Sequence, residues 1–422
     1  MRADVTVCGL GYVGLALAQQ MSTSGMVVIG YDVDPVVTAE LAAGRSHIDD
    51  VLDDDLTAMS IAGFTVSSDP AALGASDAVV ICVPTPLDAE GAPDLGAVRS
   101  AAAAVGARLR PGMLVVLEST SFPGTTDEVV RPILEQTSGL TAGVDFHLAF
   151  SPERIDPGNR VRTMAKTPKV VGGYTPGCRT RAIELYGRFV EKVVRARGTR
   201  EAEMAKLLEN TYRHVNIALV NEMAIFCHRF GIDIWDVVDC AATKPFGFEP
   251  FRPGPGVGGH CIPVDPHYLA FKARSVGLES TLIDAAERIN AGMPAYVVER
   301  CADLLRTHGG ELAGAHVLLL GVTYKPNIRD VRMSPAYDVV RDLRARGARV
   351  SYHDPFTPRF TVDGEPVPAT TDLTAALRAA DLSLLLQDHT AHQPEVLTAH
   401  ARLLFDARGV LAHAGDPHVE VL

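Results

Sequence analysis

The chain has 422 residues, of which 47% are hydrophobic and 21% are charged, and its formal net charge is −12. A chain of this length is expected to hold two or three domains, and its composition is that of a soluble globular protein. The acidic balance argues against nucleic acid or an anionic membrane as the main partner. No apolar run reaches the roughly 18 residues that a membrane-spanning helix needs.

The cysteines also limit the class of protein. Seven are present, an odd number without the paired spacing of a metal site. We therefore expect no bound metal, reduced thiols and a cytoplasmic location. The first apolar run leads directly into a glycine motif rather than into a cleavage site, so a signal peptide is not expected.

A glycine motif follows the first predicted strand. Residues 5–8 are a short β-prone run, residues 9–14 read GLGYVG, and a helix is predicted over 15–24. A second strand over 27–31 ends at Asp32. An acidic residue at this distance from the glycines completes the dinucleotide-binding fingerprint.

Each part of this fingerprint has a physical task. Gly9 is expected to make the turn, Gly11 to admit the pyrophosphate, and Gly14 to let the helix and strand pack closely. The helix N-terminus would face the phosphates. Asp32 would accept hydrogen bonds from the ribose, which favours NAD over NADP.

Three further strands of buried character are predicted at 78–83, 113–117 and 146–150. Ligands bind beyond the carboxyl ends of the strands in an open parallel sheet. The polar residues after these ends are Thr85, Thr120 and Glu153. Helix N-capping is the alternative interpretation of the two threonines. Glu153 is either a base with a raised pKa or a solvated loop acid.

Residues 199–230 predict one long amphipathic helix. Lys206, Asn210 and His214 are four residues apart and share one face, which in most helices is solvated. A helix this long commonly packs against a twin, so we expect a homodimer or a higher homo-oligomer. Helical structure is predicted to continue over 232–240, and another helix over 280–293 is expected to end in a turn.

The stretch 251–269, FRPGPGVGGHCIPVDPHYL, is rich in glycine and proline. Cys261 follows the glycines, whose amides can lower the pKa of a partly exposed thiol. The alternative is a small buried hydrophobic residue. Asp265, one helical turn later, could orient a water molecule or the thiol.

A second α/β unit is predicted to begin with a strand over 316–320. The loop after it, 323–332, carries three basic residues and therefore suits a phosphate-bearing ligand. Further strands are expected to end near 352–355, 380–386 and 403–406.

These parts predict the oxidation of an alcohol to an acid. A thiolate adds to an aldehyde to give a thiohemiacetal, oxidation of that adduct gives a thioester, and water releases the acid. Lys206 would stabilise the oxyanions. Two NAD molecules would be consumed in each turnover.

Six motifs together resemble those of nucleotide-sugar 6-dehydrogenases of the UDP-glucose/UDP-N-acetylhexosamine dehydrogenase family, over residues 3–420. They are GLGYVGL at 9–15, ESTSFPGTT at 118–126, SPERIDPG at 151–158, the Lys206/Asn210 pair, GPGVGGHCIPVDP at 254–266 and GVTYKPNIRDVRMSPA at 321–336.

The resemblance implies an α/β fold in which two Rossmann-like doubly wound domains are joined by a central helical dimerisation domain. It implies an NAD-binding domain over 1–198 and a central domain with the catalytic cysteine loop over 199–300. A nucleotide-sugar-binding domain would occupy 301–422.

The resemblance also implies roles for the matching residues. Cys261 would be the nucleophile and Lys206 the oxyanion lysine. Water would be positioned and activated by Asn210 and Asp265, with Glu153 acting in thioester hydrolysis and Thr120 binding water. The expected NAD contacts are Gly9, Gly11, Tyr12, Val13, Gly14, Asp32, Val83, Pro84, Thr85, Thr120 and Arg332. The expected sugar-nucleotide contacts are Glu153, Arg154, Lys206, Asn210, Arg252, Gly258 and Lys325.

Residue 264 bears on the choice of substrate. Simple UDP-glucose dehydrogenases usually carry a lysine there, whereas this chain has Val264, with His260 before the cysteine and TKPF at 243–246. This pattern resembles the N-acetylhexosamine branch, and UDP-N-acetylglucosamine enzymes in particular. We expect UDP-N-acetylglucosamine as the substrate and a uronic acid for polysaccharide biosynthesis as the product, with UDP-glucose or dTDP-glucose as the alternative.

Two rival functions differ in the residues that they need. A single-step NAD alcohol dehydrogenase of the 3-hydroxyacyl or 6-phosphogluconate kind needs neither Cys261 nor a second nucleotide-binding domain. A nucleotide-sugar sensor without activity would need none of Cys261, Lys206 and Glu153, and all three are present.

Overall fold

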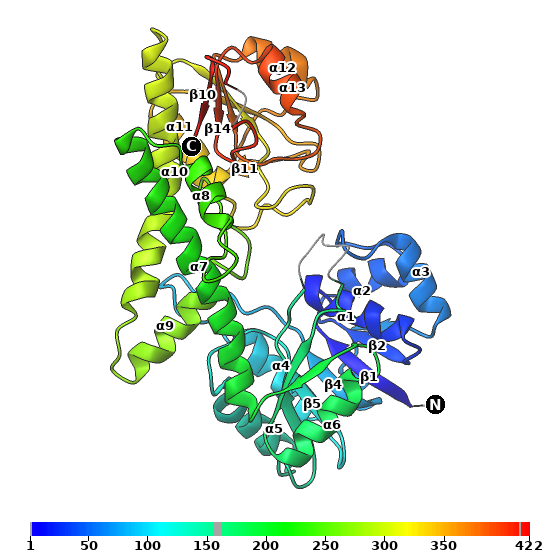
Figure 1. Cartoon of the computed structure of the whole chain (residues 1–422). Coiled ribbons are helices and arrows are strands. Elements are labelled where there is room, and N and C mark those ends of the chain that lie inside the picture. Colours follow the sequence, from blue (N-terminus) through cyan, green and yellow to red (C-terminus); the bar gives the residue numbers. More distant parts are fainter. Residues whose placement is uncertain (1, 156–162, 413–414) are drawn as a thin grey trace. The chain divides into compact units, whose positions relative to one another are not determined.

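The computed structural model describes residues 2–155, 163–412 and 415–422, and the chain divides into two compact units. The first unit comprises Met1–Glu209 and His267–Glu279, and the second comprises Asn210–Pro266 and Ser280–Leu422. Helix α7 (Thr199–Phe230) runs from the first unit into the second (Figure 1).

The first unit is built on an eight-stranded sheet with the order β3-β2-β1-β4-β5-β6-β7-β8. Its strands are β1 (Ala3–Cys8), β2 (Val28–Tyr31), β3 (Thr65–Ser67), β4 (Ser76–Ile81), β5 (Leu114–Leu117), β6 (His147–Phe150), β7 (Lys169–Gly173) and β8 (Val193–Arg195). Among the described strands of this sheet, β6 and β7 alone pair antiparallel. Because β2 and β4 flank β1 on opposite sides, the chain reverses its direction of winding there, which is where such sheets bind ligands.

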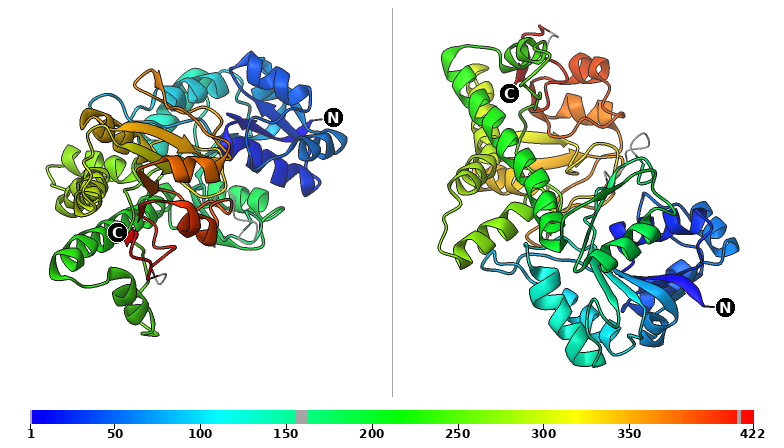
Figure 2. Two further views of the ribbon diagram at one scale, coloured as in Figure 1. Left: turned by 90° about the horizontal axis from the view of Figure 1, so that it is seen from above. Right: turned by 60° about the horizontal axis from the view of Figure 1, so that its bottom comes forward.

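Helices pack against this sheet, as Figures 1 and 2 show from several directions. They are α1 (Tyr12–Thr23), α2 (Pro35–Ala42), α3 (Asp53–Ile61), α4 (Gly96–Gly106), α5 (Arg131–Ser138) and α6 (Pro176–Tyr186), with a 3-10 helix η1 (Pro70–Gly74) and a π-helix η2 (Thr125–Val130). Their starts follow local rules: Asp34 accepts from the Val36 amide at 2.8 Å, and Pro35 is the first residue of α2. Helix α9 (Asp265–Ser275) begins in the second unit and ends in the first.

The second unit contains a parallel five-stranded sheet with the order β10-β9-β13-β14-β15. Its strands are β9 (His316–Leu320), β10 (Arg349–His353), β13 (Leu382–Leu385), β14 (Leu404–Asp406) and β15 (Val419–Val421), beside a hairpin of β11 (Thr361–Val362) and β12 (Glu365–Pro366). Its other helices are α8 (Ile234–Ala242), α10 (Thr281–Thr307), α11 (Ala336–Ala345), α12 (Leu373–Ala379) and α13 (Pro394–His400). One core joins α7, α10 and α11 to this sheet.

The predicted α/β fold, with two mainly parallel sheets and a central helical part, is confirmed. The helix over 199–230 is confirmed, and α8 lies two residues later than predicted. The predicted end of a helix at Met293 is wrong, because α10 continues through Pro294 to Thr307. Val297 and Cys301 continue its buried face, and this packing outweighs the hydrogen bond that proline removes. The domain limits at 198 and 300 stay a prediction.

Within the described ranges, no helix is long and apolar enough to cross a membrane. All seven cysteines are free thiols, as predicted.

Candidate active site

The glycine turn after β1 is as tight as the fingerprint predicts. The Gly9 amide donates to the Tyr31 carbonyl at 2.8 Å, and Gly9 has a φ of +94°. A β-carbon at Gly14 would lie 1.8 Å from the Gly9 carbonyl oxygen, so no other residue fits there. This close packing sets the start of α1 against the end of β1.

Open space in front of this turn fits a pyrophosphate. A β-carbon at Gly11 would meet no heavy atom within 4 Å, so the backbone is open to a ligand. Gly11 is the N-cap of α1, and no side chain caps the amides of the first turn, which begins with Tyr12 and Val13. Such a helix start, with its partial positive charge, favours a phosphate. The residues present therefore fit NAD.

Asp32 is held in position at the end of β2. Its carboxylate accepts from the Leu10 amide at 2.8 Å and from the Asp34 amide at 3.0 Å. Each oxygen of a carboxylate can accept more than one hydrogen bond, so these two bonds leave capacity for ribose hydroxyls.

Replacing Asp32 with alanine is expected to weaken NAD binding by about 1–3 kcal/mol, the cost of losing a hydrogen bond to a charged group. Titration calorimetry with NAD measures this directly. Asp54→Ala is the matched control, because Asp54 is an exposed residue of α3. Equal dissociation constants for Asp32→Ala and wild type would rule out the ribose role.

The ends of β4 and β5 are tied together. The Ser119 hydroxyl donates to the Val83 carbonyl at 2.7 Å, next to Pro84 and Thr85. Thr85 is buried and Thr120 is half-buried. The N-capping alternative for these threonines is wrong, because Leu95 precedes α4 and Gly124 precedes η2.

Lys206 and Glu153 form a buried pair in the first unit. The Lys206 ammonium donates to the Glu153 carbonyl at 2.7 Å and lies 3.5 Å from a Glu153 carboxylate oxygen. Burial raises the pKa of the Glu153 carboxyl, an effect opposed by the charges of Lys206 and Lys169. The pKa direction agrees with the predicted base, and the solvated-acid alternative is wrong. The face of α7 that carries Lys206 is buried rather than solvated.

Arg154 is already engaged by protein groups. Its guanidinium donates to the Pro168 carbonyl at 2.8 Å and pairs with Glu209. The last three residues of the SPERIDPG motif, 156–158, lie outside the described residues.

Sequence reasoning missed two buried carboxyl groups in this unit. Glu118 pairs with Lys169 at 2.8 Å and accepts from the Tyr186 hydroxyl. Glu203 accepts from the Gly124 amide at 2.6 Å and from the backbone and side chain of Thr126, and burial raises its pKa to about 7. Because Glu203 lies one helical turn before Lys206, the helix spacing could have pointed to it.

In the second unit, the glycines before Cys261 pack against the loop after β9. The Gly259 amide donates to the Arg332 carbonyl at 2.9 Å. A β-carbon at Gly258 would lie 2.7 Å from the Tyr324 side chain and 2.8 Å from the Met333 carbonyl oxygen. Only glycine allows this contact, which fixes the path of the chain into Cys261.

Cys261 is half-buried and precedes α9 by one turn. Its carbonyl accepts from the Asp265 amide at 2.9 Å. The buried Asp265 carboxylate accepts from the Asn210 side-chain amide. The structure thus brings Cys261, Asp265 and Asn210 together.

The basic candidates of the second unit have several acidic neighbours. Arg332 donates to both Asp330 carboxylate oxygens, and Arg252 pairs with Asp239. Burial, followed by the charge of Arg332, lowers the pKa of His260. Lys325 lies in the loop that follows β9.

Arg408, which sequence reasoning missed, follows β14 and is half-buried. Its guanidinium donates to the Leu386 carbonyl at 2.6 Å, and a β-carbon at Gly254 would lie 3.1 Å from it. A cation at the carboxyl end of a parallel strand and beside the glycine loop is a candidate ligand of a phosphate. The residues around Arg408 read DARG at 406–409, and this short pattern does not by itself predict a phosphate-binding residue.

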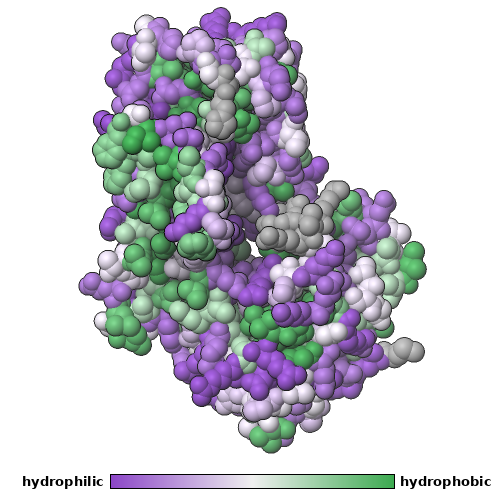
Figure 3. Space-filling view, in the orientation of Figure 1, coloured by the Kyte–Doolittle hydropathy of each residue, from purple (hydrophilic) through white to green (hydrophobic). Residues whose placement is uncertain are grey.

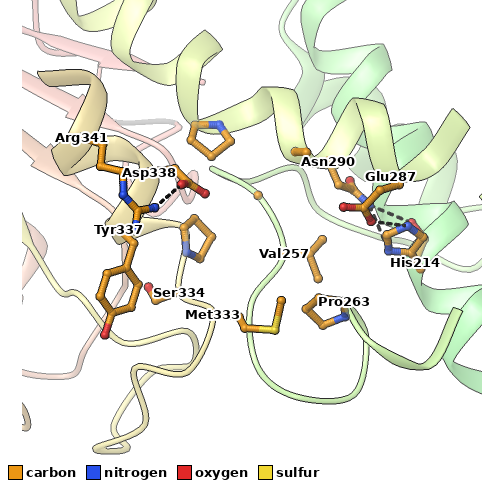
Figure 4. A pocket seen from close by; sticks show the side chains of 14 residues that line it. His214, Val257, Pro263, Glu287, Asn290, Met333, Ser334, Tyr337, Asp338 and Arg341 are labelled. Carbon is orange, nitrogen blue, oxygen red and sulfur yellow. Dashed lines mark hydrogen bonds and ion pairs between the residues drawn. The ribbon is translucent and has the colours of Figure 1, made fainter. Parts of the chain in front are cut away.

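A cavity of about 410 Å³ lies beside the glycine loop (Figure 4). The loop contributes Val257 and Pro263, and α10 contributes Glu287 and Asn290. On the opposite side of the view, the Arg341 guanidinium is paired with Asp338 of α11.

The candidate residues thus fall into two groups, one in each unit. Glu153, Arg154, Lys206, Thr120 and the NAD-binding loop belong to the first unit. The Cys261 group belongs to the second, together with Arg252, Lys325 and Arg332. Among the described residues, no cluster of His, Cys, Asp or Glu could hold a metal ion.

Three family models match successive parts of the chain. Residues 3–190, 200–292 and 318–413 match the NAD binding, central and UDP binding domains of the UDP-glucose/GDP-mannose dehydrogenase family. The chain belongs to this family.

The chain is therefore an NAD-dependent oxidoreductase, as predicted from the sequence. It is 40% identical to the UDP-N-acetyl-D-glucosamine 6-dehydrogenase of Pseudomonas aeruginosa, over 83% of this chain and 82% of that protein. The solved structure of a UDP-D-ManNAc dehydrogenase from Pyrococcus horikoshii matches with a TM-score of 0.89 and 32% identity. The match covers 99% of this chain and 98% of the Pyrococcus chain. The structure of a UDP-glucose dehydrogenase from Pyrobaculum islandicum matches with a TM-score of 0.88 and 31% identity. This match covers 100% of this chain and 97% of the Pyrobaculum chain.

Proposed function

We propose that the enzyme oxidises the C6 hydroxymethyl group of a nucleotide sugar to a carboxylate in two NAD-dependent steps. One observation carries this proposal. Helix α7 presents Lys206 and Asn210 one turn apart and buried, and each bonds to another candidate, Glu153 or Asp265. Chemistry at two oxidation levels needs both a cation for oxyanions and groups that handle water.

Cys261 is the proposed nucleophile. Its thiolate adds to the C6 aldehyde, and the carbonyl oxygen takes the negative charge of the thiohemiacetal. Loss of a hydride from C6 leaves a thioester, which water cleaves to the acid and the thiol. The half-buried position of Cys261, after loop amides and one turn before α9, supports this role.

NAD, when bound, accepts one hydride in each of the two oxidations. Gly11, the start of α1 and Asp32 would hold it. The remaining predicted contacts of this cofactor are Tyr12, Val13, Val83, Pro84, Thr85, Thr120 and Arg332.

Lys206 stabilises the oxyanions, and its position at the Glu153 carbonyl shows how its ammonium is oriented. Glu153, with its raised pKa, accepts a proton from the attacking water during hydrolysis. Asn210, Asp265 and Thr120 position that water.

UDP-N-acetylglucosamine is the proposed substrate, with UDP-glucose or dTDP-glucose as the alternative. Val264, the 40% identity to the Pseudomonas enzyme and the match to a UDP binding domain support it. Arg154, Arg252, Gly258 and Lys325 are the proposed substrate contacts. The product is a uronic acid for polysaccharide synthesis in the cytoplasm.

A homodimer is the proposed assembly, with a central domain over 199–300 between domains at 1–198 and 301–422. Tyr212, Leu219, Phe226 and Phe230 are exposed along one face of α7. Figure 3 shows hydrophobic residues gathered over this region. Light scattering tests the assembly, and a monomer at micromolar concentration would contradict it.

The experiment is a panel of UDP-N-acetylglucosamine, UDP-N-acetylmannosamine, UDP-glucose, UDP-galactose and dTDP-glucose. We expect the highest kcat/KM with UDP-N-acetylglucosamine. A preference for UDP-glucose would replace the substrate and keep the reaction. No oxidation of any member would contradict the proposal.

A further inference from the structure

A series of buried hydrogen bonds ends on the glycine loop. The Gly254 amide donates to Asn221 Oδ1 at 2.9 Å, and Asn221 Nδ2 donates to Asn290 Oδ1 at 3.0 Å. Asn290 Nδ2 donates to the His214 carbonyl at 3.2 Å and lies 3.4 Å from His214 Nδ1. Exposed fractions of 0%, 4% and 1% for Asn221, Asn290 and His214 show that these hydrogen bonds are buried.

The Gly254 amide fixes the donor and the acceptor of each hydrogen bond in this series. A backbone N–H can only donate, so the Asn221 oxygen must face Gly254 and its NH₂ group must face Asn290. The Asn290 oxygen then accepts, and its NH₂ group faces His214. His214 Nδ1 faces this NH₂ group and is assigned as an acceptor, which places a proton on Nε2, 3.5 Å from a Glu287 carboxylate oxygen. Figure 4 shows Asn290, Glu287 and His214 together at one wall of the cavity.

Asn221 binds the one amide donor that this part of the loop offers. Pro253 and Pro255 flank Gly254 and have no N–H. Gly254 is buried, and a buried amide without a partner is costly. A second bond, from Gly259 to the Arg332 carbonyl, holds the other end of the loop two residues before Cys261.

We propose that Asn221, Asn290 and His214 are positioning residues that hold the glycine loop and so place the Cys261 thiol. The hydrogen bonds described above join these three residues to one another and to the Gly254 amide, so they act on the loop backbone. The inference rests on the proposed role of Cys261. It adds to that role a set of three residues that fix the backbone leading to the nucleophile.

The first test is Asn221→Ala, which leaves the Gly254 amide without its acceptor. Backbone hydrogen exchange in a peptide covering 251–261 should accelerate by about tenfold or more, because this bond protects the loop. The kcat should fall by about tenfold or more, since small misplacements of reacting groups cost up to about 100-fold. The dissociation constant for NAD should not change.

Asn221→Asp separates positioning from mere destabilisation. A protonated carboxyl donates to Asn290 and accepts from Gly254, as the amide does, whereas an ionised carboxylate can only accept. Burial raises the pKa of such a carboxyl. The ratio of kcat for Asn221→Asp to wild-type kcat should therefore fall by about tenfold or more from pH 6 to pH 9. If Asn221→Ala does not fold, Asn221→Asp alone tests the inference.

The matched control is Asn216→Ala, on the same helix, where the side-chain amide donates to the Tyr212 carbonyl of the preceding turn at 2.7 Å. It should leave exchange and kcat unchanged. Unchanged exchange in Asn221→Ala, or faster exchange with wild-type kcat, would overturn the inference, as would a pH-independent ratio for Asn221→Asp. The exchange result does not depend on the reaction, so it also distinguishes failure of this inference from failure of the proposed function.

Discussion

Replacing Cys261 with serine is expected to lower the kcat for acid formation by about three orders of magnitude or more, the scale seen when a covalent nucleophile is removed. A serine hydroxyl is far less ionised than a thiol, so the covalent adduct would not form at a useful rate. Without the adduct there is no thioester, and at most one NADH per sugar nucleotide would be produced. Rapid-quench analysis of the sugar product measures this.

Cys240→Ser is the matched control, because Cys240 is an exposed cysteine at the end of α8 in the same unit. It should retain wild-type kcat. If Cys261→Ser still formed the acid at the wild-type rate, the covalent mechanism would be wrong, although NAD dependence would stand.

Replacing Lys206 with methionine is expected to lower kcat by about 100- to 1,000-fold, the usual cost of losing one oxyanion donor. Methionine keeps most of the volume in this buried position, so the loss would be electrostatic. Stopped-flow measurement of NADH formation separates the two oxidation steps. A variant with more than about one third of wild-type kcat would remove Lys206 from the oxyanion role.

The same variant should shift the pH profile in a known direction. The charge of Lys206 lowers the pKa of Glu153, against the effect of burial. Its removal should raise that pKa, so the acidic limb of the kcat profile should move to higher pH. Lys192→Met is the control, because Lys192 is exposed in the same unit. An unmoved acidic limb would mean that Glu153 does not act as the base.

Helical periodicity and strand composition predicted most of the fold. The apolar spacing over 199–230 is regular, and both ends of α7 were predicted from it. The C-terminal end of helix α10 was not predicted. A proline usually ends a helix, but here the packing of α10 in the folded core keeps the helix intact beyond Pro294. The antiparallel pairing of β6 with β7 depends on tertiary contacts for the same reason.

The candidate site was predictable where residue type and spacing favour a particular chemistry. The glycine fingerprint, Cys261 and the Lys206/Asn210 spacing belong to that class. Helix spacing placed Lys206, Asn210 and His214 on one face but could not show that the face is buried. The bonds of Asn221 to Gly254 and of Glu203 to Gly124 join distant positions, so no local pattern reports them.

The most direct test of a four-electron oxidation is the number of NADH molecules formed per sugar nucleotide consumed, measured at completion with the preferred substrate. The account predicts two NADH and one uronic acid for each sugar nucleotide. One NADH and an accumulated aldehyde would contradict it and would make Cys261 unnecessary for the reaction.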